Sequence, residues 1–145
     1  MICYAESSAM LRWLFNEPPG DEVFEHLRRA QKVVCSRLTL VECQRAGRRA
    51  LSEGRVTEAA LADVLAVLAQ AAARWAVLEV TREVADRAAA RFPVEPVRTL
   101  DAIHLASMSL LRESLPSLTV LSTDERVRQN SRQLGFEVLP AHVPA

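Results

Sequence analysis

Short apolar runs alternate along the chain with longer segments whose apolar residues recur at helical spacing. The runs contain few polar residues, which is typical of strands buried on both faces of a sheet. We therefore predict strands over 2–5, 33–35, 76–80, 118–121 and 136–139. The segments between them predict helices over 9–15, 21–30, 39–52, 57–75, 81–92, 99–115 and 125–134. This alternation indicates an α/β fold in three layers, with helices on both faces of a mostly parallel sheet.

Capping residues mark the starts of several of these helices. Asp21, Thr57, Thr81 and Thr99 each stand before an apolar-periodic segment, and we expect each to act as an N-cap. The chain has 145 residues, no internal repeat and no low-complexity linker. A single domain over 1–145 is therefore expected.

The helix predicted over 57–75 is rich in Ala and Leu on most of its surface. Such a helix is either deeply buried or covered by a partner chain. Asp63, Gln70 and Arg74 interrupt this apolar region, so we do not expect it to span a membrane.

The overall charge argues against a uniformly basic nucleic-acid binder, because 18 basic and 18 acidic residues give a formal net charge of zero. Lys32 is the only lysine. Arginine suits bidentate contact with phosphate, although a GC-rich genome would produce the same bias. Cys3, Cys35 and Cys43 show no metal-binding spacing, and the N-terminus lacks a secretory pattern. We therefore expect a cytoplasmic protein.

Four acids follow predicted strands or open the helices after them: Glu6, Glu42, Asp101 and Asp124. The carboxyl ends of parallel strands meet at one edge of a sheet, so these carboxylates should gather there. Each has an ordinary explanation as well. Thr39 and Glu42 match a capping box, Glu6 could be a surface turn residue, and the aspartates could be first-turn charges. Together, however, four like charges repel one another unless a cation joins them.

Carboxylates without Cys or His companions favour Mg²⁺ or Mn²⁺. Such ions activate water and stabilise phosphoryl transition states. Ser7, Ser122 and Thr123 offer hydroxyls to hold the acids or a bound water. His104 lies one turn after Asp101, and we expect it to support or pack rather than to catalyse.

A stripe of arginines lies on the helix that carries Glu42. Arg45, Arg48 and Arg49 stand at i, i+3 and i+4, with Arg37 nearby. They would form a row of side chains that bind RNA phosphates and that leads toward the acids. A solvated helix face is the alternative.

Four short motifs carry a resemblance to a known family: YAESSA at 4–9, SRLTLVE at 36–42, LDAIHLA at 100–106 and LSTDER at 121–126. In this order and spacing the chain resembles the PIN-domain family over nearly its whole length. The resemblance implies a sheet in the order 3-2-1-4-5 and Mg²⁺- or Mn²⁺-dependent endoribonuclease activity. Many small prokaryotic members resemble VapC, the toxin of a toxin–antitoxin pair, which implies a homodimer and a bound antitoxin.

On this resemblance, Glu6, Glu42, Asp101 and Asp124 bind the metal, directly or through water, and position the attacking water. One position departs from the family pattern, because the first acid is usually Asp and here is Glu6. The extra methylene moves the carboxylate by roughly a bond length, a displacement that matters in a metal site. A PIN-like RNA- or protein-binding module with weak or no nuclease activity is therefore the alternative.

Overall fold

In the computed structural model, which describes residues 1–145, five strands form one sheet. The strands are β1 (Ile2–Ala5), β2 (Lys32–Ser36), β3 (Ala76–Leu78), β4 (Leu118–Leu121) and β5 (Glu137–Leu139). Their order is β3-β2-β1-β4-β5, and every neighbouring pair is parallel. The predicted α/β class and the strand order 3-2-1-4-5 are both confirmed.

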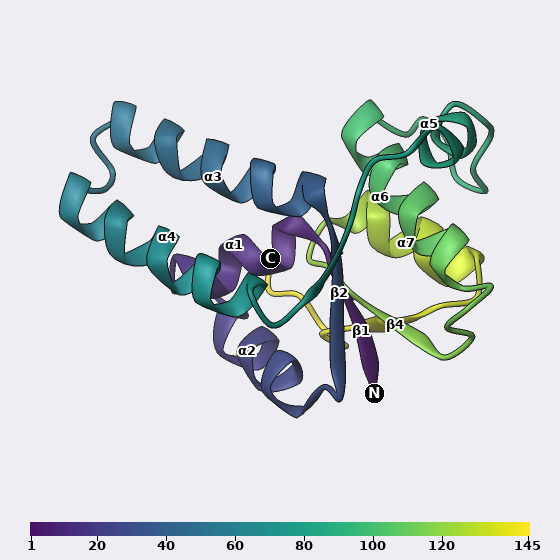
Figure 1. Cartoon of the computed structure of the whole chain (residues 1–145), viewed down its shortest axis with the longest axis horizontal. Coiled ribbons are helices and arrows are strands. Elements are labelled where there is room, and N and C mark those ends of the chain that lie inside the picture. Colours follow the sequence, from purple (N-terminus) through teal and green to yellow (C-terminus); the bar gives the residue numbers. More distant parts are fainter.

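Seven helices cover the two faces of the sheet (Figure 1). They are α1 (Ser7–Leu14), α2 (Gly20–Arg29), α3 (Arg37–Ser52), α4 (Glu58–Ala72), α5 (Arg82–Ala88), α6 (Thr99–Leu111) and α7 (Glu125–Gln133). The first four lie on one side of the sheet and the last three on the other, which gives three layers.

The sheet divides the hydrophobic core in two, because successive residues of a strand point to opposite faces. Tyr4 of β1 packs in the core beneath α5, α6 and α7, whereas its neighbours Cys3 and Ala5 pack in the core beneath α1 to α4. Both faces are thus buried. This explains why the central strands are almost free of polar residues.

The order of the strands reverses at β1. From β1 the chain passes through α1 and α2 to β2, and it reaches β4, on the other side of β1, only after α6. Ala5 pairs with Leu121, and the N–H of Glu6 donates to the Leu121 carbonyl at 3.0 Å. Ligands of open α/β sheets bind at such a switch point, beyond the carboxyl ends of the strands.

Two of the four predicted N-caps are confirmed. Thr57 and Thr81 each accept a hydrogen bond from a backbone N–H in the first turn of the helix that follows. The predictions for Asp21 and Thr99 are wrong. Both residues lie inside their helices, because the carbonyl of the residue before each helix already accepts the N–H that closes its first turn.

Two helices begin two residues earlier than predicted, α1 at Ser7 and α3 at Arg37. The last polar residue before each helix supplies the cap: the Glu6 carboxylate accepts the Ser8 N–H, and the Ser36 hydroxyl accepts the Leu38 N–H. Residues 36–38, which the predicted strand and helix leave between them, therefore belong to the end of β2 and the start of α3, and the two elements connect directly.

Three helices end three or four residues earlier than predicted, at Ala72, Ala88 and Leu111. The loop that follows α5 shows why. The Glu95 carboxylate accepts the N–H of Phe92, a backbone donor that a helix to residue 92 would have paired internally, and it also accepts the N–H of Val97.

The apolar helix α4 is not deeply buried. Only Leu61 and Leu68 are fully buried, Val64 packs against the core while partly exposed, and Val67 is 43% exposed. With α3 it forms a long hairpin that extends away from the sheet (Figure 1). Of the two interpretations of this apolar helix, burial in the core is therefore wrong, and contact with a partner chain is the one that remains. No helix of the chain combines the length and the apolar character needed to cross a membrane.

Candidate metal centre

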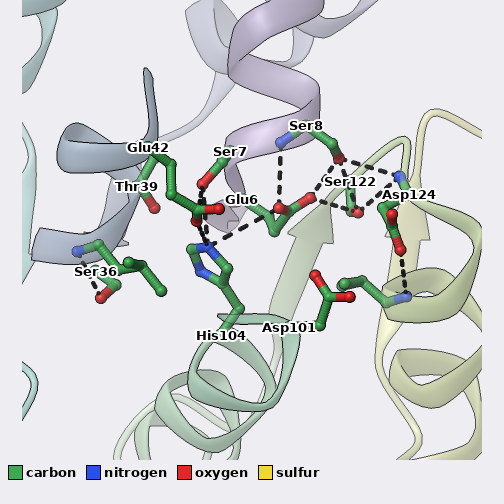
Figure 2. A network of polar contacts seen from close by, with 12 residues as sticks. Glu6, Ser7, Ser8, Ser36, Thr39, Glu42, Asp101, His104, Ser122 and Asp124 are labelled. Carbon is green, nitrogen blue, oxygen red and sulfur yellow. Dashed lines mark hydrogen bonds and ion pairs between the residues drawn. The ribbon is translucent and has the colours of Figure 1, made fainter. Parts of the chain in front are cut away.

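The four predicted acids lie at the carboxyl edge of the sheet, close to helix starts. Glu6 and Asp124 are the N-caps of α1 and α7, Asp101 lies in the first turn of α6, and Glu42 lies in the second turn of α3. Figure 2 shows Glu6 in the middle, with Glu42 and His104 on one side and the two aspartates on the other. The switch point thus gathers acids from four separate parts of the chain.

Glu6 is held firmly in the interior, with only 3% of its surface exposed. One carboxylate oxygen, Oε1, accepts the N–H of Ser8 at 3.1 Å. The other, Oε2, accepts the hydroxyls of Ser122, at 2.7 Å, and of Ser8. The alternative of a surface turn residue is therefore wrong, and Ser122 lies against the first acid.

Ser8 joins the ends of β1 and β4, a role that we did not predict. Its hydroxyl donates to Glu6 and accepts the backbone N–H groups of Thr123 (2.9 Å) and Asp124 (3.0 Å). One donated and two accepted bonds use the full capacity of a hydroxyl. The contact that Thr123 makes here is through its backbone. The signal in the sequence is the spacing, because a serine two residues after a capping acid can reach its carboxylate.

His104 is the centre of a second network and is 1% exposed. Its Nε2 atom lies 2.6 Å from the Glu42 carboxylate and 3.0 Å from the Ser7 hydroxyl, and its Nδ1 atom lies 2.8 Å from the Tyr4 hydroxyl. A carboxylate only accepts, so we assign the hydrogen to Nε2, and Nδ1 then accepts the Tyr4 hydroxyl. The chain Tyr4–His104–Glu42 fixes the orientation of the second acid.

The capping-box alternative for Glu42 is wrong. The Thr39 hydroxyl donates to the Ala5 carbonyl at 2.9 Å, and Ser7 donates to Glu42 at 2.7 Å. Burial alone would raise the pKa of Glu42, but the hydrogen bonds from His104 and Ser7 outweigh burial and leave the pKa below its ordinary value. Glu42 is therefore ionised at neutral pH.

Asp101 is in the opposite situation. Its Oδ2 atom is buried and has no hydrogen-bond partner. Burial, followed by repulsion from Asp124 and Glu6, raises its pKa to about 6, and Arg98 offsets only part of that increase from 3.8 Å away. An ionised Asp101 is thus destabilised by its surroundings.

A divalent cation fits this arrangement, because it would coordinate the orphaned oxygen of Asp101 and cancel the repulsion among three acids. Asp124 uses only Oδ1 to cap α7, accepting the Val127 N–H at 3.0 Å. No three side chains of the metal-binding types converge closely enough to form a finished coordination site. Binding therefore requires the acids to rotate toward the ion.

Two of the four predicted RNA-binding arginines are held by neighbouring acids. Arg37 pairs with Glu79, which follows β3, at 2.6 Å, and Arg49 pairs with Glu53, the C-cap of α3, at 2.9 Å. Arg45 and Arg48 form no ion pair, and with Glu42 they line a surface hollow of about 550 Å³. That hollow lies on the α3 flank of the acids.

Comparison with known proteins identifies the fold and its relatives. The model of the PIN domain family matches residues 3–133. The chain belongs to the PIN-domain family. Ribonuclease VapC46 of Mycobacterium tuberculosis (strain ATCC 25618 / H37Rv) is 33% identical over 140 residues, which cover 94% of this chain and 95% of that protein.

Two solved structures share the PIN fold with this chain. One is Mycobacterium tuberculosis VapC20, described as a Sarcin-Ricin loop cleaving toxin, with a TM-score of 0.65, 15% identity and coverage of 92% of this chain and 95% of that one. The other is VapBC2 from Rickettsia felis, bound to a DNA fragment from their promoter, with a TM-score of 0.62, 9% identity and coverage of 95% and 97%.

Proposed function

We propose that this PIN-domain protein is a metal-dependent endoribonuclease that hydrolyses phosphodiester bonds in RNA and acts as the toxin of a toxin–antitoxin pair. Asp101 carries the proposal, because its buried oxygen lacks a hydrogen-bond partner and is repelled by two further acids. The similarity to VapC46, which is named a ribonuclease, supports hydrolysis of phosphodiester bonds as the reaction at this cluster of acids.

Glu6, Asp101 and Asp124 are the ligands that we assign to Mg²⁺ or Mn²⁺, because these ions prefer hard oxygen donors. When bound, the ion makes a water more acidic and stabilises charge on the attacked phosphate. Glu42 would hold the ion directly or through water and would orient the attacking water. Its bonds to His104 and Ser7 keep it ionised and correctly turned for that role.

Arg45 and Arg48 are the members of the arginine stripe that are free to contact RNA phosphates. Arg37 and Arg49 would have to leave their glutamate partners first. Exposed ion pairs of this kind contribute about 0–1 kcal/mol, so replacing the glutamate partner by an RNA phosphate costs little free energy.

The partners that we propose are an antitoxin protein and a second copy of this chain. The VapBC2 structure from Rickettsia felis, which shares the fold, supports a two-component assembly. The exposed apolar face of α4, including Val67, supplies surface for such contacts. A cytoplasmic location is part of the same proposal, and the three cysteines are buried and free.

A PIN-like RNA- or protein-binding module with weak or no nuclease activity is the second candidate, and Glu6 favours it. Hydrogen bonds from Ser8 and Ser122 occupy both oxygens of that carboxylate. Glu6 is thus less available to an ion than Asp101 is.

A cleavage assay on a structured RNA with Mn²⁺ separates the two candidates. The nuclease proposal predicts cleavage by the unmodified protein, its loss in EDTA and its fall to background in Asp101→Asn. Asp63→Asn, at an exposed acid of α4, is the matched control and should cleave normally. Cleavage that appears only in Glu6→Asp would support the second candidate. Absence of cleavage in every variant would contradict the nuclease proposal.

A further inference from the structure

A second hollow, also of about 550 Å³, opens on the flank of the acids opposite the Arg45–Arg48 hollow. Arg98 and Pro96 line it from the loop before α6, and Asp124, Arg126 and Gln129 line it from the start of α7. Asp124 belongs both to this hollow and to the metal centre. The hollow therefore begins at the proposed ligands themselves, and its volume is in the range of roughly 300–1,000 Å³ that is typical of small-ligand sites.

The loop wall of this hollow is held in place by hydrogen bonds, two of them from a buried side chain. Asn130 is fully buried, and its amide group accepts the Val94 N–H and donates to the Val94 carbonyl, both at 2.9 Å. Glu95 accepts two more N–H groups of the loop, and Arg126 donates to the Pro96 carbonyl. The hollow is thus formed in advance of any ligand.

The lining offers the groups that recognise a nucleotide. Arg98 is 86% exposed and has only the 3.8 Å contact with Asp101, and Arg126 forms no ion pair, so both guanidinium groups retain free donors for a phosphate. The Gln129 amide can both donate to and accept from a base edge. Pro96 adds an apolar surface against which a base can pack.

The charges of the hollow also depend on the metal centre. Arg98 and Arg126 face Asp124 and Glu125, so the formal charges of the lining cancel. A cation held by Asp124 would neutralise that carboxylate and leave the hollow positive. The hollow then attracts an anion only when the neighbouring centre is loaded.

We propose that this hollow binds the nucleotide of a single-stranded RNA that lies next to the attacked phosphate, with Arg98 and Arg126 on its phosphate and Gln129 on its base. Arg45 and Arg48 bind the strand on the other side of the cut, so the RNA crosses the row of acids. This inference rests on the nuclease function proposed above.

The test measures fluorescence anisotropy of a short fluorescein-labelled single-stranded RNA. Ca²⁺ replaces Mg²⁺ so that the acids are loaded while the RNA stays uncut, because Ca²⁺ also takes oxygen ligands but differs from Mg²⁺ in size and geometry. The RNA is checked for intactness after each titration. Arg98→Ala/Arg126→Ala should weaken binding at least about tenfold and reduce the slope of log K against log salt by about 0.7, since the two arginines contact one phosphate and each phosphate contact on a single strand contributes about 0.7.

Arg29→Ala/Arg74→Ala is the matched control, because it also removes two exposed arginines but lies before β2 and β3, at the opposite edge of the sheet. It should bind within about twofold of the unmodified protein, with an unchanged salt dependence. A photoreactive 4-thiouridine RNA should crosslink to residues 93–98 or 124–129 of the unmodified protein, a readout that needs no variant.

The outcomes separate this inference from the nuclease proposal. Equal binding by the two double variants, with no crosslink to either segment, would overturn the nucleotide site while RNA cleavage still stood. If the unmodified protein neither bound nor cleaved RNA, the proposed function would fail, and this inference with it.

Discussion

Asp101 is the residue whose surroundings are least favourable to its charge, and this makes a pH-dependent prediction. Its pKa is about 6 in the folded protein and about 3.8 as an ordinary Asp. Between these values the folded state binds the proton more tightly than the unfolded state does, so the free energy of unfolding falls as the pH rises through this window. Above pH 6 the folded protein carries the full loss of stability that an ionised Asp101 causes.

Asp101→Asn removes that penalty. Without divalent metal, calorimetric unfolding at pH 7.5 should show a melting temperature a few degrees above that of the unmodified protein, and at pH 4 the two should coincide. Added Mn²⁺ should raise the melting temperature of the unmodified protein only. A variant less stable than the unmodified protein at pH 7.5 in EDTA would contradict this description of the site.

The Tyr4–His104–Glu42 chain makes a second prediction at the same scale. Nitrogen NMR of the imidazoles should show His104 with its hydrogen on Nε2, and His26 and His142 serve as internal references. Tyr4→Phe should shift only the His104 signals and reduce Mn²⁺ affinity about tenfold, because groups that orient ligands contribute on that scale. A hydrogen on Nδ1 in the unmodified protein would show that the assignment is wrong.

The sequence points to the acids, but several supporting roles depend on tertiary contacts. The placement of Glu6 and Asp124 after strands predicts their edge of the sheet. Ser8 reaches the Asp124 N–H across 116 positions of the chain, and Tyr4 reaches His104 across 100. Neither contact leaves a periodic signal, because each depends on which strand lies beside β1.

Among the elements, the loop between α5 and α6 depends most on one side chain. Asn130→Ala would leave both the N–H and the carbonyl of Val94 without their side-chain partner. Unfolding in urea should show a loss of about 2–3 kcal/mol, since each unsatisfied buried group costs about 1–3 kcal/mol. Hydrogen exchange at the Val94 amide should also accelerate.

Gln133→Ala is the control for that variant, because Gln133 is an exposed residue of the same helix. Its stability and its Val94 exchange should match those of the unmodified protein. Equal behaviour of the two variants would mean that Asn130 does not hold the loop.

The strands were predicted closely because their apolar runs are buried on both faces and carry a clear pattern. The helix ends were predicted less well. At α1 and α3 the cap is the polar residue that directly follows or ends the strand, Glu6 or Ser36, so the helix starts before the apolar spacing becomes visible. Beyond α5, Asn130 supplies the loop with hydrogen bonds from 36 positions away, a contact that no local propensity encodes.

For the molecule as a whole, a net charge of zero conceals an uneven distribution. The acids gather at the switch point of the sheet, and arginine-lined hollows lie on either side of them. Alternation of strands and helices predicts the layers and the acidic edge. The order 3-2-1-4-5 came from the family resemblance, because many strand orders share the same alternation.

The claim that these acids form a metal centre is tested most directly by titrating Mn²⁺ into the protein in a calorimeter at pH 7.5, alongside Asp101→Asn. Our account predicts micromolar binding to the unmodified protein and none to the variant, since the substitution removes a ligand and one of the charges that attract the ion. Equal binding to both, or no binding to either, would contradict a metal centre at Asp101.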